Sequence, residues 1–119
     1  MQQLVDTSIW ADHFRQQNET LQLLLDHSQV VIHHLVIGEL AMGHVSPRKE
    51  VLRSLDMLPK VRQANDLEVR EFIEQHKLFG SGIGYVDAHL LASARISQVA
   101  LWTRDKRLHT AAACLDLAP

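Results

Sequence analysis

Four acidic residues stand in or directly beside apolar stretches, where a solvated carboxylate is not normally placed: Asp6, Glu39, Asp87 and Asp105. Two carboxylates about 4 Å apart repel each other by roughly 4 kcal/mol at an effective dielectric of 20, so four that converge need a cation or stay partly protonated. An all-oxygen site suits a hard ion, and Mg²⁺ or Mn²⁺ fits it better than Zn²⁺. Such an ion neutralises a phosphodiester and activates the attacking water. These residues therefore indicate metal-dependent hydrolysis of an anionic polymer.

Each acid also has a structural alternative. Asp6 and Asp105 both precede an expected helix, where either side chain could serve as an N-cap. Asp87 falls in the first turn of a helix, where the macrodipole favours a negative charge. Glu39 shares its helical face with Leu35 and with apolar neighbours, which leaves no polar stripe, so we expect it to be enclosed rather than solvated.

Hydrophobic periodicity and helix breakers predict strands that alternate with helices. Strands are expected near 3–5, 30–33, 60–63, 99–103 and, weakly, 115–117; helices are expected near 8–16, 19–27, 35–45, 47–57, 66–78, 85–96 and 106–114. This order predicts a single α/β domain over residues 1–119, with a mostly parallel central sheet and helices on both faces. Ligands of such sheets bind outside the carboxyl ends of the strands, and Asp6 and Asp105 both fall at that edge.

The composition limits how the protein could bind nucleic acid and in which compartment we expect it. A net charge of −2 excludes binding of nucleic acid by bulk positive charge alone. However, Arg104, Lys106 and Arg107 surround Asp105, and basic groups beside an acidic residue suit an anionic substrate held at a cation. The single Cys114 fits a reducing, cytoplasmic setting. Neither a secretory signal nor an apolar run of membrane-spanning length is visible.

Four motifs, in this order, resemble those of the PIN-domain ribonucleases, and specifically the VapC-like toxins of bacterial toxin-antitoxin pairs. The motifs are Val5-Asp6-Thr7-Ser8-Ile9-Trp10, Gly38-Glu39-Leu40, the block from Gly80 to Ala92, and Leu101-Trp102-Thr103-Arg104-Asp105-Lys106-Arg107-Leu108. Each motif alone is weak, but the ordered set is specific and spans nearly the whole chain.

The resemblance implies metal-dependent cleavage of RNA, with the four acids holding Mg²⁺ or Mn²⁺ directly or through water. It implies that Ser8 and Thr103 support the site by orienting carboxylates or water. It also implies a homodimer and a VapB-like antitoxin whose C-terminal segment covers the active groove. One departure is His33-His34, where relatives often have a small hydroxyl residue; we expect these two side chains to point to opposite sides of a strand.

Two other functions compete with this interpretation. A noncatalytic RNA-binding or regulatory module could keep the same fold, although the presence of all four acids disfavours degeneration. A receiver-like phosphoacceptor domain is also doubly wound and acidic, but it needs a pair of adjacent acids after the first strand. Here Asp6 stands alone before Thr7, and Asp56 falls within an expected helix.

Overall fold

The computed structural model describes residues 2–119, which contain three short strands and seven helices. The strands are β1 (Gln3–Val5), β2 (Val30–Val31) and β3 (Ala100–Trp102), and the helices are α1 (Thr7–Arg15), α2 (Glu19–Asp26), α3 (His34–Met42), α4 (Arg48–Asp56), α5 (Asp66–His76), α6 (Tyr85–Ser97) and α7 (Lys106–Cys114). None of these helices is both long and apolar enough to cross a membrane.

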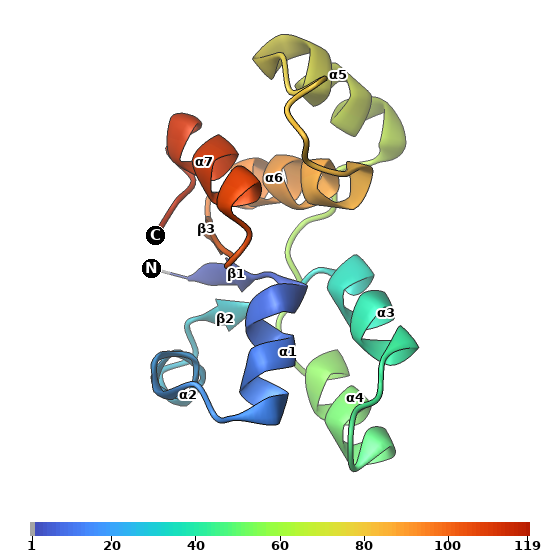
Figure 1. The fold of residues 1–119 in the computed structure, drawn as a ribbon, viewed down its shortest axis with the longest axis vertical. Helices are drawn as coiled ribbons and strands as arrows, with labels where there is room; N and C mark the ends of the chain where they lie inside the picture. The colour runs from blue at the N-terminus through green and yellow to red at the C-terminus, as the bar shows by residue number, and fades with distance from the viewer. Residues whose placement is uncertain (1) are drawn as a thin grey trace.

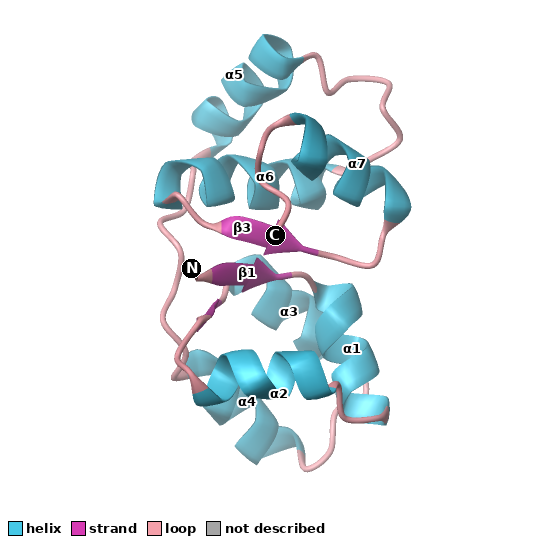
Figure 2. Ribbon diagram, turned by 90° about the vertical axis from the view of Figure 1, so that its left-hand side faces the viewer, coloured by secondary structure: helices cyan, strands magenta, loops and turns pink. Residues whose placement is uncertain are grey.

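The three strands form one parallel sheet in the order β2-β1-β3, so the chain winds outward from β1 in both directions. Figure 1 shows α5, α6 and α7 on the β3 side of the molecule and α1 to α4 on the other side. In Figure 2 helices α5, α6 and α7 lie above the strands, and α1, α2 and α4 lie below them. The predicted α/β architecture is therefore confirmed, and β1 is the place where strand order reverses, at which open α/β sheets bind ligands.

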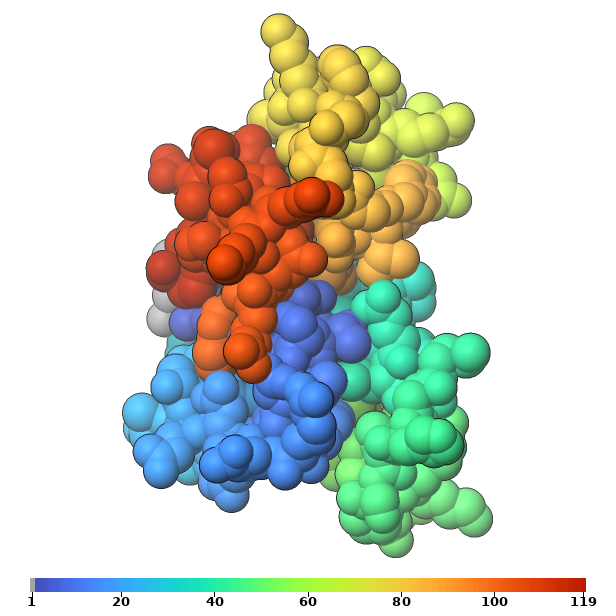
Figure 3. All heavy atoms as spheres, in the orientation of Figure 1, coloured from blue at the N-terminus to red at the C-terminus, as the bar shows by residue number. Residues whose placement is uncertain are grey.

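The register of the sheet brings the two ends of the chain together. Val5 of β1 is the partner of Trp102 of β3, and the backbone N–H of Asp6 donates to the carbonyl of Trp102 at 2.9 Å. The residues that follow these strands, Asp6 and Thr103, therefore emerge side by side. Figure 3 shows the same juxtaposition at the surface, where the orange β3–α7 segment lies against the blue segment of α1 and α2.

Two predicted strands are absent from the described residues. The segment 60–63 makes only an isolated parallel bridge, between Ile32 and Lys60. The segment 115–117 makes a single bond to the sheet, in which the N–H of Leu101 donates to the carbonyl of Leu117 at 2.7 Å. Asp116 has a φ of +59°, which is a turn conformation rather than an extended one. Both predictions were wrong because apolar alternation alone does not provide the ladder of bonds that defines a strand.

The expected strand over 30–33 is also shorter than predicted, because His33 begins a helix instead. Its Nδ1 accepts a hydrogen bond from the backbone N–H of Leu35 at 3.0 Å, which makes His33 the N-cap of α3. The rings of His33 and His34 stack with centroids 4.8 Å apart, so they do not point to opposite sides of a strand. The imidazole of His33 thus caps α3 at a position where the chain has no small hydroxyl residue.

Helix α6 is the central helix of the fold. Every residue from Ala88 to Ala94 is buried, whereas a surface helix buries only one stripe. Asp66 of α5 contacts the N-terminal part of α6 twice. Its carboxylate accepts from the Tyr85 hydroxyl at 3.1 Å and lies 3.1 Å from Nε2 of His89. The element that carries Asp87 is therefore held rigidly against the sheet.

Candidate active site

Asp6 is the most enclosed of the four predicted acids, with 6% of its surface exposed. It precedes α1, yet its side chain makes no capping bond to that helix. Instead, its Oδ2 accepts from the Ser8 hydroxyl at 2.9 Å and from the Thr103 hydroxyl at 2.7 Å. A buried carboxylate needs such donors because it has lost the solvation of water. The structural alternative for Asp6, helix capping, is therefore not what its side chain does.

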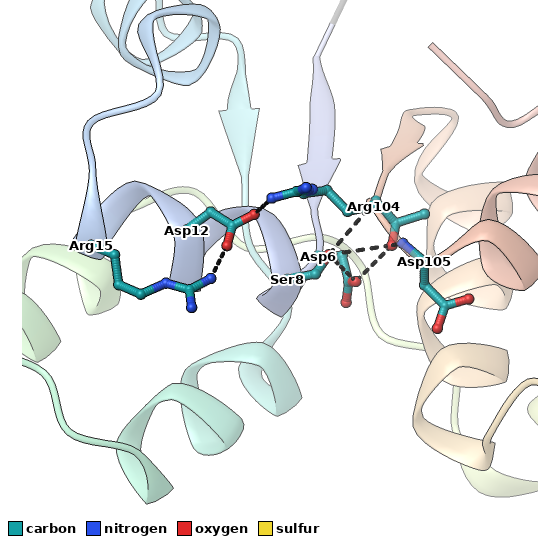
Figure 4. A network of polar contacts seen from close by, with 7 residues as sticks. Asp6, Ser8, Asp12, Arg15, Arg104 and Asp105 are labelled. Atoms are coloured by element: carbon teal, nitrogen blue, oxygen red, sulfur yellow. Dashed lines mark hydrogen bonds and ion pairs between the residues drawn. The ribbon is translucent and has the colours of Figure 1, made fainter.

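The two supporting hydroxyls are themselves held by the backbone. Ser8 Oγ accepts from the N–H of Arg104 at 3.1 Å, and Thr103 Oγ1 accepts from the N–H of Asp105 at 3.0 Å. A hydroxyl has one proton to donate, and in both residues that proton is directed to Asp6. The network fixes the orientation of the Asp6 carboxylate and links it to the turn that carries Asp105, as Figure 4 shows.

Asp105 is the N-cap of α7, since its Oδ1 accepts from the N–H of Leu108 at 3.0 Å. The capping alternative is therefore correct for this residue, but it occupies only one of the two carboxylate oxygens. In Figure 4 the side chains of Asp6 and Asp105 extend to the same side of the strand ends. The bond to Leu108 thus also aims the exposed Asp105 carboxylate at the neighbourhood of Asp6.

Glu39 reaches the site from α3, where its Oε1 accepts from the Thr7 hydroxyl at 2.6 Å. The expectation that Glu39 is enclosed was wrong, because it is exposed. Helix α3 is buried through Val36 and Leu40, whereas Met42, three residues after Glu39, is 90% exposed. Glu39 therefore lies on the open flank of the helix, where Thr7 holds it.

Asp87 is half-buried in the first turn of α6, and the N–H of Gly84 donates to its Oδ2 at 3.4 Å. Burial raises the pKa of Asp87, the bond from Gly84 opposes that shift, and the charges of Asp6, Asp105 and Glu39 raise the pKa further. Hydrogen bonds link the other acids to the same place: Thr103 connects Asp6 to the backbone of Asp105, and Thr7, the residue after Asp6, donates to Glu39. All four predicted acids therefore lie in one neighbourhood. Asp6 precedes α1, Glu39 lies on α3, Asp87 lies in the first turn of α6, and Asp105 precedes α7.

The gathered carboxylates fit a divalent cation by their chemistry. Every donor is a carboxylate oxygen, which is the ligand type of hard ions. Burial is the main cause of the raised pKa of Asp87, and the smaller part that comes from the neighbouring carboxylates is the repulsion that such an ion relieves. Within residues 2–119, however, no three acidic, His or Cys side chains already lie close enough together to hold an ion. The acids thus share a neighbourhood, in which Asp6 is the carboxylate that two hydroxyls hold in one orientation.

The three predicted substrate-binding cations do not form one patch. Arg104 forms an ion pair with Asp12 of α1, beside the acidic site. Lys106 and Arg107 instead line a separate hollow next to α5, and the Arg107 side chain packs so closely on Gly82 that a Cβ there would lie 2.7 Å from its guanidinium. Of the three, only Arg104 is directly linked to the network around Asp6.

Sequence reasoning missed several residues that build this site. Thr7 was passed over although it directly follows Asp6, and the N–H of Gly84 was not considered as a donor. Asp12 and Arg15 carried a weak signal, because their spacing of three residues on a helix allows an ion pair, which the structure contains. The pairing of Asp12 with Arg104 had no signal, since 92 residues separate them.

Comparisons with known proteins show the family of this chain. A family model described as PIN domain matches residues 4–113. Ribonuclease VapC32 of Mycobacterium tuberculosis, found in two strains, is 42% identical over 111 residues, which cover 92% of this chain and 90% of the relative. The crystal structure of PAE2754 from Pyrobaculum aerophilum superposes with a TM-score of 0.67 at 20% identity, covering 93% of this chain and 84% of that one, and supports the fold alone. The chain therefore belongs to the PIN-domain family, as a VapC-like member.

Proposed function

We propose that this protein is a divalent-metal-dependent endoribonuclease that hydrolyses RNA phosphodiester bonds as the toxin of a VapBC-like toxin-antitoxin pair. The observation that carries this proposal is the convergence of four carboxylates, one of them fixed by two hydroxyls and another with a raised pKa. Its similarity to a ribonuclease over nearly the whole chain supports the choice of RNA as substrate.

Different side chains have different roles in the proposed site. Ser8 and Thr103 hold Asp6 in one orientation, and Thr7 holds Glu39. Asp87, with its raised pKa, takes up a proton more readily than an ordinary aspartate and gives it up when its oxygens are needed as ligands. Such preorganisation lets a site bind a cation and a phosphodiester without rearranging its supports.

The ion that we propose is Mg²⁺ or Mn²⁺, held by Asp6, Glu39, Asp87 and Asp105 directly or through water. When bound, it would supply charge neutralisation at the phosphodiester, a more acidic attacking water and stabilisation of the leaving oxygen. The oxygen-only donor set and the absence of a Cys or His contribution favour these ions over Zn²⁺.

The proposal also includes partners and a setting. We propose one nuclease domain over residues 1–119 that acts in the cytoplasm, forms a homodimer and is neutralised by a VapB-like antitoxin covering the active groove. The name of the relative supports the antitoxin and the RNA. The lone, exposed Cys114 suits the reducing cytoplasm.

The direct test is cleavage of single-stranded RNA by the purified protein. We expect cleavage to stop on chelation, to return with Mg²⁺ or Mn²⁺, and to be lost in Asp6→Asn and Asp87→Asn. Asp56→Asn is the matched control, because Asp56 is an exposed acid at the end of α4, away from the site. Equal cleavage by all three variants would identify a contaminating nuclease and remove the proposal.

Metal uptake gives a second readout that does not need activity. Calorimetry should show binding of Mg²⁺ or Mn²⁺ to the wild type and to Asp56→Asn, with much weaker binding to Asp87→Asn. RNA binding without cleavage under every metal tried would favour the rival function, a noncatalytic RNA-binding module of the same fold.

A further inference from the structure

A triad of charged residues lies beside the acidic site and has no role in the proposed chemistry. The two oxygens of Asp12 form ion pairs with two different arginines: Oδ1 with Arg15 on the same helix, and Oδ2 with Arg104 after β3. Figure 4 shows Asp12 between the two guanidinium groups, with Arg104 extending from the turn that holds Asp6. One carboxylate thus joins two cations that are distant in the sequence.

The arginines remain available to a ligand while Asp12 does not. The side chain of Asp12 is 20% exposed, whereas those of Arg15 and Arg104 are 76% and 65% exposed. A guanidinium has five N–H donors in a planar fork. The pair with Asp12 uses one nitrogen of each arginine, so most donors of both forks stay free and two positive charges exceed one negative charge. The free donors and the net positive charge of the triad suit an anion with several acceptor oxygens, such as a phosphate.

All three residues of the triad line a hollow of about 700 Å³, together with Trp102, Gln16 and Gln17. This volume is within the range of sites that take small ligands. An indole offers a face for a base, and amides offer donors and acceptors for base edges. The lining therefore suits a nucleotide better than a bare anion.

Hydrogen bonds connect a residue that lines the hollow with the acidic site. The N–H of Arg104 donates to Ser8 Oγ, which donates to Asp6 Oδ2, so Arg104 is two hydrogen bonds away from the fixed carboxylate. Trp102 is the strand partner of Val5, the residue before Asp6. A strand of RNA whose scissile phosphodiester lies at the four acids would therefore have a neighbouring nucleotide within reach of this hollow.

We propose that the hollow is the subsite for the nucleotide next to the scissile bond, that Arg15 and Arg104 bind its phosphate, and that Asp12 is a positioning residue that holds both guanidinium groups toward it. This inference rests on the proposed function. It adds Asp12 and Arg15 to the substrate-recognition residues, whereas Lys106 and Arg107 line a different hollow.

The arginines are tested by steady-state kinetics on a single-stranded RNA oligonucleotide with the full-length variants. Arg15→Gln and Arg104→Gln should each raise KM about tenfold while kcat changes little, because a phosphate contact away from the reacting atoms is made equally in ground and transition states. Each should also reduce the slope of log affinity against log salt by about 0.7, the value for one phosphate contact on a single strand. Arg53→Gln on α4, an exposed arginine remote from the triad, should change neither quantity.

Asp12 needs a different readout, because its removal adds net positive charge. Asp12→Asn should leave the salt slope undiminished but lower kcat/KM at least threefold, since the arginines keep their charge and lose their placement. A purely structural ion pair would instead lower the melting temperature of Asp12→Asn and leave both KM and the salt slope at wild-type values. That outcome would overturn the positioning role.

Failure of this inference can be separated from failure of the proposed function by measuring binding in an Asp87→Asn background, by fluorescence anisotropy of the same oligonucleotide. Cleavage by the wild type together with unchanged KM in both arginine variants would overturn the subsite alone. Absence of cleavage by the wild type, with RNA binding that still depends on Arg15 and Arg104, would overturn the nuclease and support the subsite.

Discussion

Replacing Thr103 by Val should weaken the fold and the site together. The Thr103 side chain is almost fully buried, at 7% exposure, and it donates to Asp6 at 2.7 Å while accepting from the N–H of Asp105 at 3.0 Å. Valine has nearly the same shape but neither donates nor accepts. The substitution therefore removes two hydrogen bonds without opening a large cavity.

The size of the effect follows from the partners. A hydrogen bond to a charged group contributes about 1.5–3 kcal/mol and a neutral one about 1 kcal/mol. Ser8 continues to donate to Asp6 in the variant, so that carboxylate is not left without a partner. We therefore expect Thr103→Val to lower the free energy of unfolding by about 2–3 kcal/mol.

Urea unfolding followed by circular dichroism, at pH 7 and with chelator present, measures this loss. Thr103→Ser keeps the hydroxyl and should recover most of the stability, whereas Thr20→Val replaces an exposed threonine on α2 and should stay within about 0.5 kcal/mol of the wild type. RNA cleavage should fall in Thr103→Val and recover in Thr103→Ser. The reasoning is refuted if Thr103→Val is as stable as Thr20→Val.

Three further predictions concern other parts of the molecule. Asp87→Asn should raise the free energy of unfolding at pH 7 without metal; because the pKa of Asp87 is raised in the fold, this gain should vanish as the pH falls towards 4, in urea titrations at both pH values. Burial, with smaller effects of two nearby histidines, lowers the pKa of His33 to about 4, so the wild type should lose roughly 3 kcal/mol between pH 6.5 and 4 as the unfolded chain takes up the proton. His33→Asn keeps a capping side chain and should lack that part of the pH dependence, whatever its stability at pH 7. Gly82→Ala should lower the free energy of unfolding by about 1–2 kcal/mol, because Gly82 has a φ of +91° and its new Cβ would meet Arg107; an equal melting temperature in a thermal scan would count against this.

The sequence was informative where local chemistry decides the structure. The helix over 106–114 was predicted with its observed bounds, since Asp105 is a good N-cap. The acids at the ends of β1 and β3 were predicted to meet because parallel strands align their carboxyl ends. Capping suffices to predict the first feature, and the shared carboxyl edge of parallel strands suffices to predict the second.

Features that depend on distant contacts could not be predicted. The exposure of Glu39 follows from which face of α3 packs on the core, and the apolar residues all around that helix left the face undetermined. The strand expected at 115–117 needed a partner along its whole length, and only Leu117 has one. The Asp12–Arg104 pair joins α1 to the β3–α7 turn, and this is visible only when the chain is folded.

The bond between Thr103 and Asp6 joins residues 97 positions apart, which has a bearing on how such an enzyme is made. During synthesis the first acid emerges early, but its hydroxyl support and the Asp105 carboxylate are translated far later. A chain that stalls or is cut before Ala100 lacks β3, the strand that completes the sheet beside β1, as well as Thr103 and Asp105. Under the proposed function, incomplete copies would be inactive in the cell that makes them, because Thr103 and Asp105 are translated after the other residues of the proposed active site.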